Sequence, residues 1–180
     1  MTITIRRATT PDELAGAREL LLTSFRDDQG YGFQPQWHWD VEHLREVYVD
    51  NPRQALLVAV DEETGAVVGT CAARVGGPAS PPHPEWLAAR YADRAAVAQL
   101  VRLVTDPRHR RHGLGRRLVE ATVDLVRDEG GYRVIYLHTN AKFPGALEFW
   151  RGVGMVEVHD ARGEEDDDRF ETVHFELPLR

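Results

Sequence analysis

The stretch VTDPRHRRHGLGRRLVEA, residues Val104 to Ala121, decides the fold of this chain. Up to Thr105 it continues an apolar run typical of a strand, and from Leu114 apolar residues recur at helical spacing. At this junction five arginines and two histidines surround Gly113 and Gly115. A helix start offers backbone N–H groups and a positive dipole end to an anion, and glycine lets a phosphate approach. The stretch therefore predicts a phosphate site at a strand–loop–helix junction.

The charge of the whole chain makes that arginine cluster an exception. The 180 residues carry a formal net charge of -7, so the molecule as a whole repels nucleic acid and anionic membranes. No apolar run approaches the roughly 20 residues that cross a bilayer, and no apolar segment of a signal peptide follows the first residues. We expect a cytoplasmic protein with neither a nucleic-acid nor a membrane partner.

Apolar periodicity and turn residues define the expected elements. Thr9 or Thr10 caps a helix that begins at Pro11, and Gly65 marks the turn of a hairpin. Strands are expected at 3–8, 54–61, 66–75, 96–105, 132–139, 155–161 and 169–179, and helices at 11–25, 40–49, 114–129 and 144–154. Residues 26–37 are expected to form a loop, and residues 76–94 a proline-rich excursion.

This order of elements predicts the fold class. Strands, then a strand–helix–strand–helix series, then a final pair of strands indicate an α/β (α+β) fold with a mixed sheet and helices on both faces. Residues 96–137 are expected to form a parallel crossover. Length and composition fit one domain over residues 1–180. Ligands of such sheets bind at the carboxyl ends of the strands, where the arginine-rich loop falls.

Three phosphate-binding motifs compete for this loop. The Walker A pattern needs Gly-Lys-Ser or Gly-Lys-Thr, and neither occurs in the chain. The dinucleotide pattern G-x-G-x-x-G needs a third glycine, but Leu118 stands at that position. The pattern R-x-x-G-x-G fits, with Arg110, Gly113 and Gly115 in its three fixed positions.

With this pattern the loop resembles the coenzyme A loop of the GNAT superfamily of N-acetyltransferases. The likeness extends through LVTDPRHRRHGLGRRL, VIYLHT and ALEFWRGVGM. It implies a GNAT-like domain whose mostly antiparallel sheet is splayed between two central parallel strands. It also implies acetyl-CoA as co-substrate, no metal, and a small-molecule amine as acceptor. Members of the family are often dimers, which leaves a homodimer open.

The same resemblance indicates which residues contact the cofactor. Leu103, Val104 and Thr105 would pair with the pantetheine through their backbone, and the pyrophosphate would rest on the amides of the loop. The loop residues are Arg110, Arg111, His112, Gly113, Leu114, Gly115 and Arg116. Asn140 is a looser candidate for an asparagine of the family pattern.

The catalytic half of the family pattern is altered. A glutamate that often acts as the base corresponds to Gln99, and the tyrosine that serves as the acid corresponds to Trp150, whose indole can only donate a hydrogen bond. His138, at the carboxyl end of its strand, is the leading candidate for the base, because histidine titrates near neutral pH. A structural hydrogen-bonding role for His138 remains the alternative. Further candidates for the lost catalytic groups are His38, Asp40, Glu42 and His43.

Residues 27–40 fall where the family builds its acceptor pocket. Aromatic rings and a carboxylate there suit an apolar or cationic amine through burial and cation–π contact. The candidate residues are Tyr31, Phe33, Trp37, Trp39 and Asp40. A structural role, in which the tryptophans cover the sheet, fits the sequence equally well.

Cys71 and the acidic run at 164–168 are interpreted as structural. Cys71 lies in an apolar strand and is expected to be a buried thiol rather than a nucleophile. The acidic run is expected to be a solvated loop rather than a metal site.

The leading functional hypothesis is direct acetyl transfer from acetyl-CoA to the primary amine of a small molecule. One alternative is a coenzyme A sensor that has lost turnover, suggested by Gln99 and Trp150. Another is an acetyltransferase of protein N-termini or lysines.

Overall fold

The computed structural model describes residues 2–79, 83–110 and 112–179. The chain forms two compact units, Met1–Arg74 with Val101–Leu125, and Val75–Leu100 with Val126–Arg180. Within the described ranges, none of the helices has the length and apolar character needed to span a membrane.

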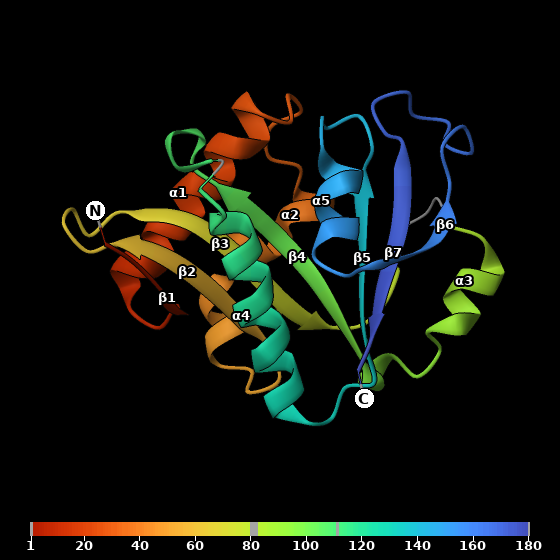
Figure 1. The fold of residues 1–180 in the computed structure, drawn as a ribbon, viewed down its shortest axis with the longest axis horizontal. Coiled ribbons are helices and arrows are strands. Elements are labelled where there is room, and N and C mark those ends of the chain that lie inside the picture. The colour runs from red at the N-terminus through yellow and green to blue at the C-terminus, as the bar shows by residue number, and fades with distance from the viewer. Residues whose placement is uncertain (1, 80–82, 111, 180) are drawn as a thin grey trace. The chain divides into compact units, whose positions relative to one another are not determined.

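One strand, β4 (Val97–Thr105), contributes residues to both units. The strands follow the order β1-β2-β3-β4-β5-β7-β6 in a seven-stranded sheet (Figure 1). Parallel and antiparallel pairs both occur, and helices alternate with the strands along the chain. The predicted α/β fold class with a mixed sheet is therefore confirmed.

Three antiparallel strands make up most of the sheet of the first unit. β1 (Ile3–Arg7) pairs with β2 (Ala55–Asp61), and β2 pairs with β3 (Val67–Val75) in the predicted hairpin. Gly65 turns this hairpin with a φ of +73°, which favours a residue without a side chain. The second half of β4 belongs to the same unit.

α1 (Pro11–Asp27) begins where the sequence predicts it. Thr10 is the N-cap: its hydroxyl accepts the N–H of Glu13, and the Glu13 carboxylate accepts the N–H of Thr10 at 3.1 Å. That carboxylate also accepts a hydrogen bond of 2.7 Å from Arg6. Burial acts to raise the pKa of Glu13, but these hydrogen bonds outweigh it and bring the pKa to about 2.

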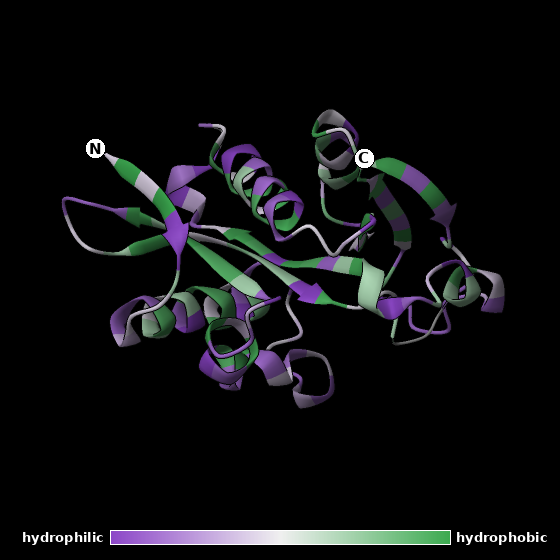
Figure 2. Ribbon diagram, turned by 90° about the horizontal axis from the view of Figure 1, so that it is seen from below, coloured by the Kyte–Doolittle hydropathy of each residue, from purple (hydrophilic) through white to green (hydrophobic). Residues whose placement is uncertain are grey.

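Helices cover both faces of the sheet in the first unit. α1 and α2 (Pro35–Glu42) lie on one face, and α4 (Leu114–Glu129), striped with apolar and polar residues, lies on the other (Figures 1 and 2). A Cβ on Gly16 of α1 would come within 2.9 Å of Val67, and a Cβ on Gly69 within 2.8 Å of Leu118 in α4. Both glycines therefore allow a helix to pack directly on β3.

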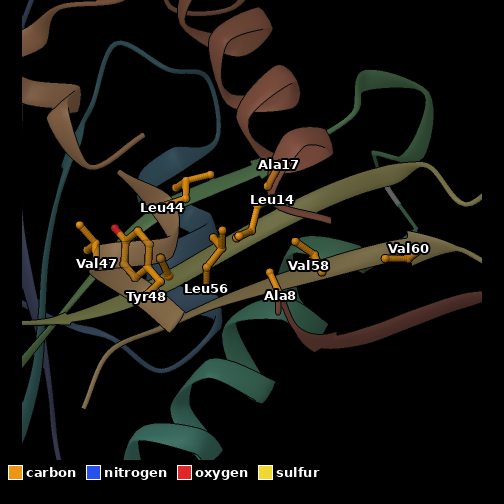
Figure 3. Close-up of a cluster of buried hydrophobic side chains, with 10 residues drawn as sticks. Ala8, Leu14, Ala17, Leu44, Val47, Tyr48, Leu56, Val58 and Val60 are labelled. Atoms are coloured by element: carbon orange, nitrogen blue, oxygen red, sulfur yellow. The ribbon is translucent and has the colours of Figure 1, made fainter. Parts of the chain in front are cut away.

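The apolar core of the first unit lies between α1 and β2. Leu14 and Ala17 of α1 pack with Leu56 and Val58 of β2 (Figure 3). Tyr48, from the π-helical turn η1 (Arg45–Val49), joins the same cluster. A second cluster consists of Leu21, Phe25, Val41 and Val104.

α2 begins earlier than predicted. The sequence prediction placed a loop at 26–37 and a helix at 40–49, whereas Pro35 occupies the first turn of α2. The fixed φ of proline suits a first turn, so this residue starts the helix instead of extending the loop. α2 is also non-helical at His38, where φ is −123°. The predicted helix at 40–49 therefore consists of the end of α2, up to Glu42, and the π-helical turn η1.

The second unit contains the parallel pair and the last two antiparallel pairs. β4 pairs in parallel with β5 (Val134–Asn140) over Val97–Gln99. β5 is antiparallel to β7 (Thr172–Pro178), and β7 is antiparallel to β6 (Val156–Asp160). The predicted parallel connection and the final strand pair are confirmed.

Short helices complete the second unit. α3 (Glu85–Arg90) and the 3-10 turn η2 (Arg94–Ala96) precede β4, and α5 (Ala146–Gly152) follows β5. Leu87, Tyr91, Val97 and Tyr136 form the core, so the predicted excursion contributes buried side chains. Arg90 binds the Glu176 carboxylate with hydrogen bonds of 3.0 and 2.5 Å, and the Tyr91 hydroxyl donates to it at 2.7 Å.

The cap of α1 predicts an acid-dependent loss of stability. Glu13→Gln keeps the capping hydrogen bonds but removes the charge beside Arg6, so we expect the free energy of unfolding to fall by about 1 kcal/mol at neutral pH. The pKa of Glu13 is lowered from 4.5 to about 2 by folding. The ionised Glu13 carboxylate therefore stabilises the folded protein fully at pH values above 4.5, its pKa in the unfolded chain. This stabilisation disappears as the pH falls from 4.5 to about 2.

Urea denaturation of the wild type and of Glu13→Gln, at pH values between neutral and about 2, measures the difference in their free energies of unfolding. Glu19→Gln, on the exposed side of the same helix, is the matched control. An equal loss in both variants at every pH would contradict the prediction.

Candidate active site

The arginine-rich loop joins the end of β4 to the start of α4. The Asp106 N–H donates to the carbonyl of Val68 at 2.9 Å, which fixes the point where the chain leaves the sheet. The 3-10 turn η3 (Pro107–His109) follows, and Asp106 accepts the N–H of Arg108 at 2.8 Å. Side-chain hydrogen bonds from Arg108 lower the pKa of Asp106 to about 2, so the carboxylate that caps this turn is charged at neutral pH.

α4 begins with the amides of Leu114 and Gly115. They precede the hydrogen bond from the N–H of Arg117 to the carbonyl of Gly113, which is 3.0 Å long. Gly113 has a φ of +71°, and a Cβ on it would meet no described atom within 4 Å. The backbone conformation therefore favours glycine, and no described atom occupies the space beside its Cα.

Basic side chains of the loop are already paired with acids. Arg110 forms an ion pair with Asp28, which lies just after α1. Arg116 lies 3.8 Å from Glu120, one helical turn further along α4. Such exposed pairs are weak, so an incoming phosphate can replace the carboxylate. Arg111, also predicted to contact the cofactor, lies outside the described residues.

A pocket of about 210 Å³ opens beside the start of α4. Its walls are Ile3, His109, His112, Leu114 and Arg117. The Nδ1 atom of His109 is buried without a hydrogen-bond partner among the described atoms, and the Asp106 carboxylate lies 3.8 Å away. Two histidines and an arginine therefore extend the basic surface of the loop.

Leu103, Val104 and Thr105 form the last part of β4. Among the described pairs, β4 is paired with β5 over Val97–Gln99, so these three residues lie beyond that ladder. The side chain of Val104 is anchored in the core of the first unit. The backbone of this segment is thus held from one side by packing.

The aromatic residues predicted for the acceptor pocket converge on His38. Its ring stacks on Phe25 at a centroid distance of 3.8 Å and an interplanar angle of 13°. Tyr31, Phe33 and Trp37 surround it at centroid distances of 5.9, 5.8 and 6.3 Å. Trp39 is separate from this aromatic cluster: it is 49% exposed and its ring contacts His43.

His38 is neutral at physiological pH. Burial, together with the nearby charge of Arg102, lowers its pKa to about 4, although Asp40 acts in the opposite direction. Its Nδ1 atom accepts the N–H of Gln34 at 3.0 Å. The imidazole therefore serves as an uncharged centre of the aromatic cluster.

Asp40 is fully buried, and both of its carboxylate oxygens are engaged. Arg102 of β4 binds it with hydrogen bonds of 3.0 and 2.5 Å, and the Tyr48 hydroxyl donates to it at 2.6 Å. Burial acts to raise the pKa of Asp40, but these hydrogen bonds and the charge of Arg102 hold it below its ordinary value. Arg102 was not predicted as a site residue, because its one signal in the sequence is a charge within the apolar run AVAQLVRLVT.

His138 lies in β5 of the second unit with an exposed side chain. The Tyr136 hydroxyl is 3.4 Å from the Nδ1 atom of His138 and 2.8 Å from that of His174 in β7. Burial and the charges of neighbouring histidines lower the pKa of His174 to about 3, so His174 is neutral. His138 thus ends a short row of polar rings that the sequence analysis did not detect.

Asn140 and Trp150 make structural contacts in the second unit. The Asn140 amide donates to the carbonyl of Arg169 at 2.9 Å and accepts the N–H groups of Lys142 at 3.1 Å and Glu171 at 3.0 Å. Trp150 is 7% exposed. Their predicted contacts with the cofactor and the leaving thiol stay predictions.

Residues 15–155 match the family model described as the acetyltransferase (GNAT) family. The chain belongs to the GNAT acetyltransferase family. No curated protein sequence matches the chain significantly.

Solved structures share the GNAT fold at low sequence identity. A GNAT acetyltransferase of Staphylococcus aureus Mu50 superposes with a TM-score of 0.74 at 16% identity, covering 99% of this chain and 100% of the other. A phosphinothricin acetyltransferase of Sinorhizobium meliloti in complex with AcCoA superposes with a TM-score of 0.72 at 18% identity, covering 99% of this chain and 89% of the other. A chain of the NatC complex bound to Gag peptide and CoA superposes with a TM-score of 0.69 at 17% identity, covering 100% of both chains.

As a GNAT acetyltransferase, the protein is an acyltransferase whose co-substrate is acetyl-CoA. The residues present fit this donor: a helix start with a glycine at positive φ accepts a phosphate, and the pocket beside it is basic. Across the part of the chain that the structure describes, no three His, Cys, Asp or Glu side chains are grouped so that they could hold a metal ion.

Cys71 of this GNAT protein is predicted to be chemically inert in the folded state. It is completely buried in β3, and burial raises its pKa to about 12. Because the thiolate is the reactive form, we expect Ellman's reagent to detect no thiol in the native protein and one after unfolding in guanidinium chloride. Rapid labelling of the native protein would contradict this assignment.

Proposed function

We propose that this GNAT enzyme acetylates the primary amine of a small molecule that carries an aromatic or apolar group. The observation that supports this most is the aromatic cluster of Tyr31, Phe33 and Trp37 around the neutral His38. Asp40 is already paired with Arg102, so the faces of the aromatic rings are proposed to recognise the acceptor. Such faces bind apolar groups and ammonium ions. The single cysteine, which cannot form an internal disulfide, also favours a cytoplasmic location, where thiols stay reduced.

The proposed donor site uses residues of the first unit. The amides at the start of α4, near Gly113, bind the pyrophosphate, and Arg110 and Arg116 add charge once they leave their carboxylate partners. Backbone groups of Leu103 to Thr105 pair with the pantetheine. An N–H of this segment, near Val104, polarises the thioester carbonyl.

The proposed chemistry is direct transfer. Acetyl-CoA supplies an activated acetyl group: a C–N bond forms to the amine, the C–S bond breaks, and the amine proton is lost while the thiolate gains one. An alkylammonium has a pKa of about 10.4, so a base must remove its proton before attack. The inert thiol of Cys71 offers no covalent alternative.

His138 is the proposed base. It is exposed at the end of β5, and its Nδ1 atom lies beside the Tyr136 hydroxyl, which orients the ring. Trp150 is proposed to donate only a hydrogen bond, because its indole N–H does not ionise usefully.

A panel of amines tests the function directly. Coenzyme A release from acetyl-CoA is followed with a thiol reagent in the presence of tryptamine, phenethylamine, spermidine, phosphinothricin, and peptides with a free N-terminus or a lysine. We expect turnover with the arylalkylamines and little with the peptides. Turnover with the peptides alone would replace the small-molecule proposal, and acetyl-CoA binding without turnover would contradict it.

Gly113→Asp tests the phosphate site. The backbone of the new aspartate must adopt a φ of +71°, and its carboxylate places a negative charge where the pyrophosphate is proposed to bind. We expect acetyl-CoA affinity, measured by calorimetry, to fall by at least about 100-fold. Gly65→Asp is the matched control, since Gly65 has a φ of +73° and lies in the hairpin turn. Equal affinities for the two variants would remove this loop from the donor site.

His138→Gln tests the base. We expect kcat/KM to fall by at least about 100-fold and its acidic limb, set by the imidazole in the wild type, to flatten. His159→Gln is the control, because His159 belongs to the same row of rings but is hydrogen-bonded to Glu164 at 3.0 Å. A pH profile of the His138 variant that matches the wild type would exclude His138 as the base.

A further inference from the structure

Arg102 has a backbone conformation that its side chain does not favour. Its φ is +59°, and no other non-glycine residue in the described ranges has a positive φ. It lies within β4, directly before Leu103–Thr105, the segment proposed to bind acetyl-CoA. A residue with a Cβ adopts this conformation at a cost, so surrounding contacts must hold it there.

Contacts from several elements hold Arg102 in place. The Thr70 hydroxyl of β3 donates to its carbonyl at 2.8 Å. Its guanidinium lies 5.6 Å from the centroid of the Phe25 ring. Besides its two hydrogen bonds to Asp40, it donates to the backbone carbonyl of Trp37 at 2.6 Å. One side chain thus joins β4 directly to α2.

This ion pair is buried on both sides. The side chain of Asp40 has no exposed surface, and that of Arg102 is 12% exposed. A buried pair of this kind often contributes no more to stability than a well-packed apolar pair, because both charges lose their hydration. What it adds is geometry, since a bidentate pair fixes both distance and orientation.

α2 depends on such an anchor for its position. It has eight residues, it is non-helical at His38, and its N-cap Gln34 makes no side-chain capping bond. A helix this short is not stable by itself. The contact of Arg102 with the Trp37 carbonyl therefore fixes the segment that carries the aromatic cluster.

We propose that Arg102 and Asp40 are positioning residues for acetyl transfer. They lock α2, with its proposed acceptor residues, to the part of β4 proposed to bind the acetyl group, so that the amine nitrogen and the thioester carbon stay aligned. This inference rests on the proposed function. Neither residue needs to touch the substrate.

An apolar replacement of the whole buried triad separates positioning from stability. In Arg102→Met/Asp40→Leu/Tyr48→Phe every charged or hydroxyl group of the triad is removed together, so packing is kept without a lone buried charge. The control is Arg90→Met/Glu176→Leu/Tyr91→Phe, which removes the same chemistry from the second unit.

Two measurements give the result. With the panel amine that the wild type acetylates fastest, we expect kcat to fall by about 100-fold in the first variant, acetyl-CoA affinity to be retained, and the control to keep its kcat. Hydrogen exchange should rise in residues 31–42 and 101–105 of the first variant only. A folded first variant with wild-type kcat and exchange would overturn the proposal.

Arg102→Lys provides a second variant if the triple replacement does not fold. Lysine keeps the charge beside Asp40 but cannot make the bidentate contact and the Trp37 contact together. We expect a lower kcat with unchanged acetyl-CoA affinity, and a full kcat would overturn the proposal. If the wild type acetylates no amine of the panel, the proposed function fails, while hydrogen exchange still decides whether Arg102 positions α2.

Discussion

The buried carboxylate of Asp40 is the constraint around which the first unit is built. A charge without exposed surface must be matched where it lies, because water cannot stabilise it. Arg102 and Tyr48 supply the match, and they come from β4 and from the turn that follows α2. Arg102 makes this contact from a backbone with a left-handed φ of +59°.

Local patterns were enough to predict most of the fold. The N-cap of α1, the hairpin at Gly65 and the helix start at Leu114 each depend on residues close together in the sequence, and all three were predicted correctly. The start of α2 was predicted too late. Pro35 suits both a loop and a first turn, and only the packing of His38 on Phe25 shows which applies.

In the candidate site, too, residues close together in the sequence could be predicted more readily than contacts between distant ones. The donor loop stays a prediction, and the sequence allows it because R-x-x-G-x-G acts through the conformation of adjacent backbone amides. The Arg102–Asp40 pair joins residues 62 positions apart, and the Tyr136–His174 contact joins residues 38 positions apart. No periodicity records such contacts. Residue type alone grouped Trp39 with Tyr31, Phe33 and Trp37, whereas its ring contacts His43, and its role at the acceptor site stays a prediction.

The complete burial of the single cysteine has a practical consequence. A protein whose native thiol is sealed inside β3 is a ready background for site-specific labels, because an added surface cysteine would react alone. Glu19 on α1 and Trp86 on α3 are exposed and belong to different units. Fluorophores at these two positions would turn the molecule into a ruler that follows, in solution, how its two units respond to the arrival of acetyl-CoA.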